Sequence, residues 1–459
     1  MDCSVTSQKN KKTKKQKNNA IMENQNSSTS ISSSNVVSNN DTLTKSQTIA
    51  QKLETYKKII EANGIKINAP FDPRYAASLI KRILEPLSLY YFRTEFVGFE
   101  GDDYPERRGE APLIFASNHS GMAFPWDAII FSSMLLKIHN YDMTKVARPL
   151  TAPMLSQSNL MSPFAIENFW KRAGGVDATS LNFETMMEQG KFNVLIYPEG
   201  VGGIGKGFDK KYELQRLSTS TLRMSLKHKA DIIPFATVNA EYINPFSYSI
   251  EILDNLVQKL GIPFLPVGFM TVLIPLQPWM FYFALPAKLI FVRGRRIKPY
   301  KILGKPVEDA TEEEIFALRD AIHAIMQKEL NEAVERYGES PYNWKEFFLT
   351  ALWKWKKLPE YLPLTWAFRF IDHEKQFQKR LFELNNFSNI APSLEQKVIQ
   401  AQQIARTTES ETQAEDDKDV FDMVKETVDL VVDNPEVLLM YVPVVGWLPT
   451  IWNEIKKQI

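Results

Sequence analysis

Four short apolar runs, each bounded by turn residues, alternate with longer stretches of helical spacing in the middle of the chain. The runs occupy residues 111–117, 193–198, 231–238 and 288–294. The stretches of helical spacing occupy residues 126–138, 181–189, 218–229 and 312–337. Because strands that alternate with helices usually form a parallel or mixed sheet covered by helices, we expect one α/β domain over residues 49–340.

A long uncharged stretch spans residues 260–287. Its 28 residues would be enough for a membrane span, but five of them are prolines. One straight membrane helix would lose too many backbone hydrogen bonds at these prolines. We therefore expect buried loops, the wall of a hydrophobic tunnel, or a rim that faces a membrane.

Residues 341–406 begin with an amphipathic pattern and predict a helical C-terminal extension. Apolar residues recur at helical spacing, at Trp344, Phe347, Phe348, Ala351, Leu352 and Trp355. Four lysines lie mostly elsewhere on the same helix. Two interpretations remain open: a helix packed on a core, or an interfacial membrane helix, for which tryptophan together with lysine is typical.

The end of the chain divides into an acidic and an apolar segment. Residues 407–436 contain eleven acidic residues and two lysines, which indicates a linker or a loose helix. Residues 437–459 open with 17 uncharged residues, interrupted by Pro443, Gly446 and Pro449. This segment is too short and too broken to span a bilayer, so we expect it to dip into one or to dock on the protein.

Composition excludes several classes of protein. Residues 1–48 are rich in Lys, Asn and Ser and are expected to be disordered, as a solvated tail or as a basic segment that touches anionic lipid or nucleic acid. Among 459 residues, 55 Lys and Arg against 54 Asp and Glu leave a net charge of +1, so overall charge indicates no nucleic-acid partner. The single cysteine, Cys3, excludes a disulfide scaffold and a Cys-rich zinc site.

The segment 115–131 combines a histidine and an aspartate around a strand end. The expected strand ends at Ser117, His119 lies in the polar turn that follows, and Asp127 lies where the next helix starts. A neutral imidazole can remove a proton from a hydroxyl near pH 7, and a carboxylate on its far nitrogen fixes the tautomer. The alternative is structural, with Asp127 capping the helix and His119 as a turn residue.

The segment 193–217 carries a glycine-rich loop after its strand. Pro198, Glu199 and Gly200 are followed by four more glycines up to Gly207, so the backbone can approach a ligand closely. Residues 200–206 also match the outline of a nucleotide P-loop. Gly207 stands where that loop needs Ser or Thr, which disfavours nucleotide binding.

These two segments together resemble the glycerolipid acyltransferase superfamily, which includes the lysophosphatidic acid (1-acylglycerol-3-phosphate) acyltransferases. The family signature is a strand, then Asn-His with an Asp a few residues on, and a later strand that ends in Pro-Glu-Gly. Here these are Asn118, His119 and Asp127, with Pro-Glu-Gly at 198–200, about 80 residues later. Residues 231–240 and 171–178 resemble two further blocks, so the resemblance covers roughly residues 80–310.

The resemblance implies a glycerol-3-phosphate acyltransferase-like fold, a mixed sheet flanked by helices. It implies transfer of an acyl chain from acyl-CoA or acyl-ACP to the hydroxyl of a lysophospholipid, diacylglycerol or another lipid alcohol. His119 would be the general base, Asp127 would orient it, and Glu199, Gly200 and Lys206 would bind the acceptor. It also implies no bound cofactor or metal, and association with a membrane at its cytoplasmic face.

Departures from the family pattern bear on the acceptor. Seven residues separate His119 from Asp127 where four are usual, as in a subgroup with Asn-His-Ser-Gly and a later Gly-Ile-Gly-Lys. Val201 and Gly202 stand where many members carry an arginine for the acceptor phosphate, and Ala178 stands where a basic residue is common. These losses favour a neutral acceptor, unless a nearby basic residue replaces the charge. The nearby basic residues are Lys206, Lys210, Lys211 and Arg216.

Two alternatives from other classes remain. A catalytically inactive lipid-binding protein would share the fold, and a lipid ester hydrolase would use the same dyad with water. The sequence contains no Gly-x-Ser-x-Gly elbow, which disfavours the usual hydrolase route. The remaining histidines, at 139, 228, 323 and 373, are not spaced as metal ligands, so no metal is predicted. The sequence does not indicate an oligomeric state.

Overall fold

A computed structural model of the protein describes residues 37–120, 124–157, 161–258, 266–387, 392–407 and 420–448. The chain divides into two units between Lys57 and Lys58, inside helix α1 Val37–Asn68. This helix begins before residue 48, where composition predicts the end of the disordered tail, because a helix once nucleated extends into neighbouring residues at little cost. Cys3 and the lysine-rich run lie outside the described residues.

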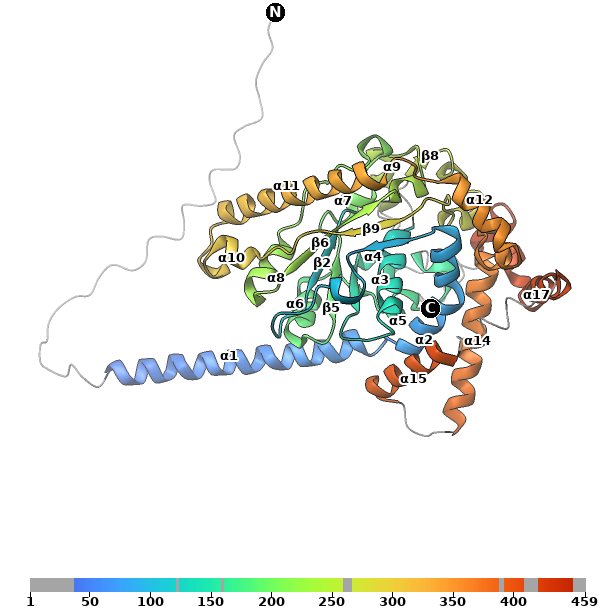
Figure 1. Ribbon diagram of the computed structural model, residues 1–459. Coiled ribbons are helices and arrows are strands. Elements are labelled where there is room, and N and C mark those ends of the chain that lie inside the picture. Colours follow the sequence, from blue (N-terminus) through green and yellow to red (C-terminus); the bar gives the residue numbers. More distant parts are fainter. Residues whose placement is uncertain are drawn as a thin grey trace, which may run out of the picture. The chain divides into compact units, whose positions relative to one another are not determined.

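A seven-stranded sheet forms the centre of the second unit (Figure 1). Its spatial order is β1-β9-β6-β2-β5-β3-β4, and all neighbouring pairs are parallel except β6 with β9. The strands are β1 Glu95–Val97, β2 Ile114–Ser117, β3 Ala147–Thr151, β4 Val176–Asp177, β5 Asn193–Ile196, β6 Ile232–Val238 and β9 Ile290–Arg293. The four strands predicted from apolar runs are β2, β5, β6 and β9, so the mostly parallel α/β sheet is confirmed.

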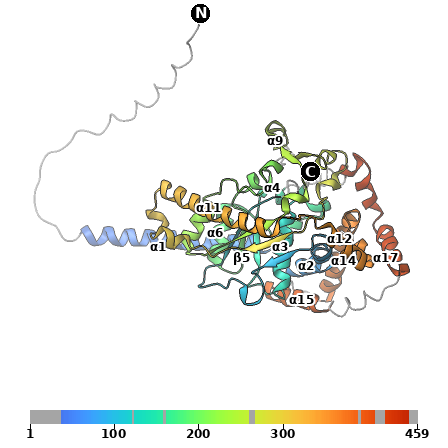
Figure 2. The same cartoon turned by 45° about the horizontal axis from the view of Figure 1, so that its top comes forward.

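Helices cover both faces of this sheet (Figures 1 and 2). Along β2, Phe115 packs into one hydrophobic cluster while Ile114 and Ala116 pack into the other, as the two-residue repeat of a strand requires. The first cluster includes α3 Trp126–Ile138 and α14 Trp366–Phe387. The second includes helices whose positions the sequence predicted, α6 Ser180–Gln189, α8 Ser220–His228 and α11 Glu312–Tyr337.

Shorter helices connect these elements. They are α2 Pro73–Leu79, α4 Pro153–Gln157, α5 Phe169–Arg172, α7 Val201–Ile204, α9 Glu251–Gln258, α10 Pro299–Leu303, α12 Trp344–Trp353, α13 Leu358–Tyr361, α15 Leu394–Thr407 and α17 Val420–Asp433. Two π-helical turns, η1 Ile80–Leu84 and η2 Leu87–Tyr91, follow α2. A separate antiparallel pair joins β7 Ser247–Ser249 to β8 Pro266–Gly268.

The C-terminal extension shares the core of the α/β domain. Trp366 of α14 lies in a T-shaped contact with Trp126 of α3, with ring centroids 5.0 Å apart. Ala401 and Val437, much later in the chain, are fully buried in the same cluster. The predicted boundary at residues 340 and 341 therefore marks a change in composition, and one core continues across it.

The uncharged stretch 260–287 is built of short turns. Its described part contains β8, the 3-10 turn η8 Thr271–Leu273 and the 3-10 turn η9 Pro278–Phe281. Prolines at both ends of this region prevent a continuous helix, as the sequence predicted. Among all the residues that the structure describes, no helix is both long and apolar enough to cross a membrane.

The acidic segment and the final apolar segment both contain helix. Residues 420–433 form α17, so this part of the predicted linker is helical, while residues 408–419 lie outside the described residues. The apolar segment forms two 3-10 turns, η13 Pro435–Tyr441 and η14 Val445–Trp447.

Candidate active site

The two sequence motifs meet because their strands are parallel neighbours. In the register of β2 and β5, Ala116 is paired with Ile196. The carboxyl ends of both strands therefore lie at the same edge of the sheet, which is where α/β proteins commonly bind ligands. The turn after β2 carries His119, and the loop after β5 carries residues 197–200.

His119 and Asp127 form a hydrogen-bonded pair. The Nδ1 atom of His119 lies 2.8 Å from Oδ2 of Asp127, and the Asp127 carboxylate is fully buried in the first turn of α3. Its other oxygen accepts a hydrogen bond from the backbone N–H of Ala128 at 2.8 Å. A carboxylate at Nδ1 favours the tautomer with its proton there, which leaves the lone pair of the neutral ring on Nε2. The long turn thus brings the two predicted residues together.

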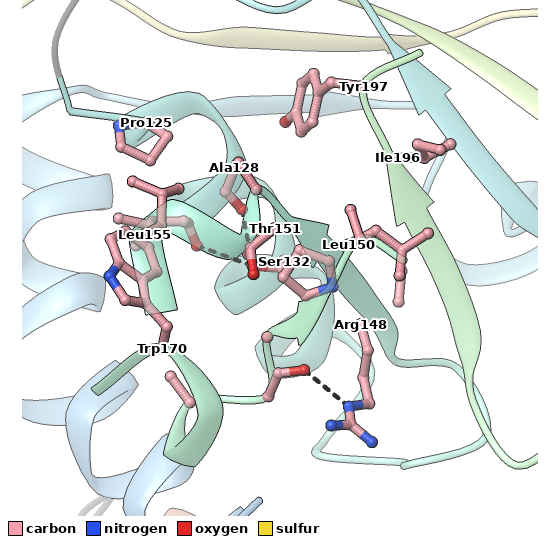
Figure 3. Close-up of a pocket in the computed structure, with 18 of the residues that line it drawn as sticks. Pro125, Ala128, Ser132, Arg148, Leu150, Thr151, Leu155, Trp170, Ile196 and Tyr197 are labelled. Atoms are coloured by element: carbon pink, nitrogen blue, oxygen red, sulfur yellow. Dashed lines mark hydrogen bonds between the residues drawn. The ribbon is translucent and has the colours of Figure 1, made fainter. Parts of the chain in front are cut away.

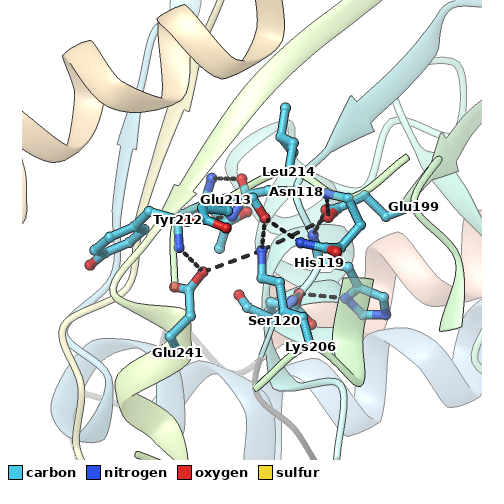
Figure 4. Close-up of polar contacts among 12 residues, drawn as sticks. Asn118, His119, Ser120, Glu199, Lys206, Tyr212, Glu213, Leu214 and Glu241 are labelled. Atoms are coloured by element: carbon cyan, nitrogen blue, oxygen red, sulfur yellow. Dashed lines mark hydrogen bonds and ion pairs between the residues drawn. The ribbon is translucent and has the colours of Figure 1, made fainter. Parts of the chain in front are cut away.

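Glu199 joins the two motifs from inside the protein (Figure 4). Its Oε1 accepts a hydrogen bond from the backbone N–H of His119 at 2.8 Å, and its Oε2 accepts one from the backbone N–H of Gln215 at 2.6 Å. The side chain has no exposed surface. Glu199 therefore positions the turn of His119, and it has no direct access to an acceptor.

Lys206 is also occupied within the protein. Its Nζ lies 3.8 Å from Oε2 of Glu199 and 3.8 Å from Oε1 of Glu241, and it donates a hydrogen bond to the carbonyl oxygen of Glu213 at 2.9 Å (Figure 4). Burial raises the pKa of Glu241, and the nearby ammonium of Lys206 opposes that rise. Two buried carboxylates draw the charge of Lys206, which was predicted to bind the acceptor, inward, and the residue does not line the cavity described below.

A cavity of about 430 Å³ opens beside His119. Figure 3 shows residues that line it. This volume lies in the range of small-molecule binding sites. His119 and Gly200 contribute to its wall, and most of the other lining residues are apolar. They include Ile129, Leu136, Leu155, Trp170, Ile196 and Phe281. Of the three residues predicted to bind the acceptor, only Gly200 lines the cavity, and its φ of 62° with ψ of −147° requires glycine.

Tyr197 is a site residue that the sequence analysis missed. Its ring stacks on His119 with centroids 4.1 Å apart, and it lines the cavity. Its hydroxyl is buried and makes no hydrogen bond with any described residue. Burial, with a smaller effect of the Asp127 charge, raises the pKa of Tyr197 far above its ordinary value, so the hydroxyl remains a donor. The sequence could have indicated Tyr197 by its position between a buried strand and Pro198.

Arg148 is a second residue that the sequence analysis passed over. Its side chain lines the cavity on the side away from Tyr197 in Figure 3 and donates to the carbonyl oxygen of Gly174 at 2.8 Å. The guanidinium lies 4.7 Å from the ring centroid of Phe71. Burial lowers its pKa to about 9, and no carboxylate within the described parts of the chain forms an ion pair with it. The guanidinium also donates to Oδ1 of Asn68 at 2.5 Å and to the carbonyl oxygen of Ile67 at 3.2 Å, which holds β3 against the end of α1.

One group of side chains has the composition of a metal site. Glu184, Glu188 and His228 place ligand atoms within 4.8 Å of one another, on α6 and α8. Lys227 already forms an ion pair with Glu184, and burial lowers the pKa of His228. None of the three lines the cavity. The group is therefore an ion-pair cluster outside the candidate active site.

Comparison with known proteins finds relatives only at low identity. Uncharacterized proteins of Mycobacterium bovis and Mycobacterium tuberculosis are 26% identical over 262 residues, which cover 57% of this chain and 67% of theirs. An uncharacterized protein of Mycobacterium leprae is 27% identical over 262 residues, which cover 57% of this chain and 65% of that protein. No protein-family model and no solved structure matches the chain. The functional argument therefore rests on the geometry of the site.

Proposed function

We propose that the protein is an acyltransferase that moves an acyl chain from a thioester, acyl-CoA or acyl-ACP, to the hydroxyl of a lipid. The observation that carries this proposal is that His119, paired with the buried Asp127, lies in the wall of a mainly apolar cavity. Such a cavity can hold an acyl chain, because burying apolar surface is favourable, and it brings that chain next to a base.

The dyad supplies the proton transfers of the reaction. Nε2 of His119 removes the proton of the acceptor hydroxyl while the hydroxyl oxygen attacks the thioester carbonyl carbon. Asp127 stabilises the imidazolium that forms. When the tetrahedral intermediate collapses, the carbon–sulfur bond breaks and the leaving sulfur takes the proton from the imidazolium. The products are the acylated lipid and the free thiol, and the base is regenerated.

Tyr197 supports this mechanism with a buried hydrogen-bond donor on the ring that stacks on His119. A buried hydroxyl without a partner costs about 1–3 kcal/mol, and an oxygen of the substrate can provide the missing acceptor. Because the ring stacks directly on His119, that oxygen belongs to the reacting part of the substrate, such as the thioester carbonyl. A donor at this place would also stabilise the negative charge of the tetrahedral intermediate.

The order of the motifs supports membership of the glycerolipid acyltransferase superfamily. A strand followed by Asn-His and a strand followed by Pro-Glu-Gly lie side by side in the sheet, and Asp127 is hydrogen-bonded to His119 although seven residues separate them in the sequence. The proposed fold is the glycerol-3-phosphate acyltransferase-like one. We propose a neutral acceptor such as diacylglycerol, because Lys206 is turned inward and Val201 stands at the position of the phosphate-binding arginine.

Purified protein tests the proposal when thiol release and lipid products are measured together. Acyl-CoA and diacylglycerol in detergent should give free CoA and acylated lipid in equal amounts, and His119→Ala should form both products 10² to 10⁴ fold more slowly. Free CoA with free fatty acid and no acylated lipid would identify a hydrolase. If acyl-CoA and acyl-ACP both remain intact with every lipid alcohol tried, the protein is an inactive lipid-binding member and the proposal fails.

A further inference from the structure

Helix α17 leaves most of its large apolar side chains exposed. Its exposed large side chains recur at helical spacing, at Val420, Phe421, Val424, Val428 and Val432, and Phe421 is 75% exposed. On the opposite side, Glu426, Asp429 and Asp433 line a polar cavity of about 440 Å³ together with Lys357 and Arg369. The helix packs on the core through Leu430 and Val431, so its exposed apolar residues form a second stripe that the core does not cover.

The uncharged segments of the chain lie next to this helix and are also exposed. The backbone N–H of Val444 donates to the carbonyl oxygen of Leu276 at 2.8 Å, and Nε1 of Trp447 donates to the carbonyl oxygen of Pro275 at 2.9 Å. The two segments, 269–276 and 438–448, are thereby joined, and α17 packs against η13 of the second one. Their exposed apolar residues are Phe269, Val272, Leu273, Leu276, Leu438, Leu439, Val442, Val444 and Leu448.

Helix α12 extends the same surface. It buries none of its residues, and Trp353 is 81% exposed. The 3-10 turn η11 Trp355–Lys357 follows it and packs against α17. Figures 1 and 2 show α12 and α17 on the same side of the second unit. We call the exposed apolar residues of α12, α17, 269–276 and 438–448 the outer apolar surface.

We propose that the outer apolar surface docks on the face of a lipid bilayer. Large exposed apolar areas on a monomeric protein commonly mark a site of interaction, and these neighbouring segments expose many large apolar side chains. Two of the four segments, 269–276 and 438–448, contain no charged residue, as is usual for chain that contacts the apolar part of a bilayer. Exposed tryptophan beside the exposed Lys345 on α12 is typical of helices that lie at a membrane interface.

The candidate active site is connected to this surface through η9. Phe281 of η9 lines the cavity beside the dyad, and its ring centroid lies 6.0 Å from that of Phe124. The same turn packs against η8, η13 and η14, which belong to the surface or border it. This one step rests on the proposed function: a lipid substrate could pass from the bilayer into the cavity along η9. Docking itself is independent of any reaction.

Flotation with phosphatidylcholine vesicles tests the proposal on the full chain. Wild-type protein should float with the vesicles, and added salt should release little of it, because apolar burial is insensitive to charge screening. The double variant Phe421→Asp/Val428→Asp should bind the vesicles at least about tenfold more weakly, since two apolar side chains no longer enter the bilayer. The matched control is Ile302→Asp on α10, which is 56% exposed but lies outside the surface and should float like wild type.

Three further outcomes decide between partners. If the double variant floats like wild type, or wild type does not float, the proposal is overturned. If light scattering shows a wild-type dimer that the double variant converts to monomer without change in flotation, a second copy covers the surface and the proposal is also overturned. His119→Ala should float like wild type, and the double variant should keep acyl transfer to detergent-dispersed acceptor, so the two proposals fail separately.

Discussion

Three contacts hold His119 in place. Asp127 binds Nδ1, Tyr197 covers one face of the ring, and Glu199 accepts from the backbone N–H. The first could be predicted from the sequence because the motif contains both residues. The other two could not, since an apolar run ending in Tyr-Pro-Glu does not reveal which side chains turn inward. For the same reason Lys206 resembled a ligand-binding residue, although two buried carboxylates hold it.

The dyad gives the first prediction. His119→Ala should lower the rate of acyl transfer by 10² to 10⁴ fold, because that is the usual contribution of a positioned general base. Asp127→Asn should lower the rate of acyl transfer less, since the imidazole of His119 remains but can adopt the wrong tautomer. Rates measured by thiol release, with circular dichroism to verify folding, check this. Wild-type rates in both variants would show that the site is elsewhere.

The second prediction isolates the hydroxyl of Tyr197. Tyr197→Phe keeps the ring that stacks on His119 but removes the donor, so kcat should fall about 10-fold to 10²-fold with little change in stability. Tyr361→Phe is the matched control, because its hydroxyl is also buried without a partner among the described residues and lies outside the cavity wall. Equal kinetic effects of the two substitutions would exclude a role for Tyr197 in the reaction.

Lys206 gives a prediction that separates binding from structure. Lys206→Ala leaves Glu199 and Glu241 without their shared cation, which should lower the free energy of unfolding by about 3 kcal/mol. Activity should fall equally with diacylglycerol and with lysophosphatidic acid, because the amine does not reach either acceptor. Denaturant titration and initial rates measure these effects. A selective loss with the phosphorylated acceptor would instead assign Lys206 to phosphate binding.

At the scale of elements, strand and helix positions followed from periodicity, and their orientations did not. The predicted strands and the helices of the α/β domain occur where the apolar spacing places them. The apolar residues of α12 and of α17 have the same spacing as those of a core helix, yet most of the large ones are exposed. Phe347 of α12 and Leu430 of α17 do pack against the core. Periodicity identifies an apolar face, but the tertiary structure decides whether protein or another environment meets that face.

The contact between α14 and α2 gives a prediction of pH dependence. His373 of α14 is buried beside Ser78 of α2, with Nε2 2.9 Å from Oγ, and burial with nearby arginines lowers its pKa to about 3. A depressed histidine pKa means that the folded state favours the neutral ring. Its stabilising effect is complete above the unfolded pKa of about 6.5 and is lost as the pH falls toward 3.

This effect should amount to about 2 kcal/mol between pH 7 and pH 5, since the unfolded histidine binds a proton in that range and the folded one does not. Urea titrations at pH 7 and at pH 5 should show that the free energy of unfolding falls more between these pH values in wild type than in His373→Gln. The difference between the two proteins isolates this histidine from other titrating groups. An equal fall in the two proteins would mean that α14 opens enough to hydrate the imidazole of His373.

At the scale of the whole molecule, the extension after residue 340 completes the core. Removing residues 341–459 would expose Trp126, Tyr91 and the apolar face of α2, which Trp366 and its neighbours cover. We expect the shortened chain to be insoluble when expressed. The milder change Trp366→Ala should lower the free energy of unfolding by about 3–5 kcal/mol, measured by denaturant titration. A soluble, cooperatively unfolding fragment 1–340 would contradict this.

The hydrogen bond between Glu199 and the backbone of His119 also constrains the order of folding. It joins positions 80 residues apart, and its geometry depends on β5 lying beside β2. Contacts of such long sequence separation form late, because loop closure must come first. The turn that aims the base is therefore complete only after the central strands have paired. During refolding, helical circular dichroism should return before catalytic competence, and Glu199→Gln should lengthen that delay.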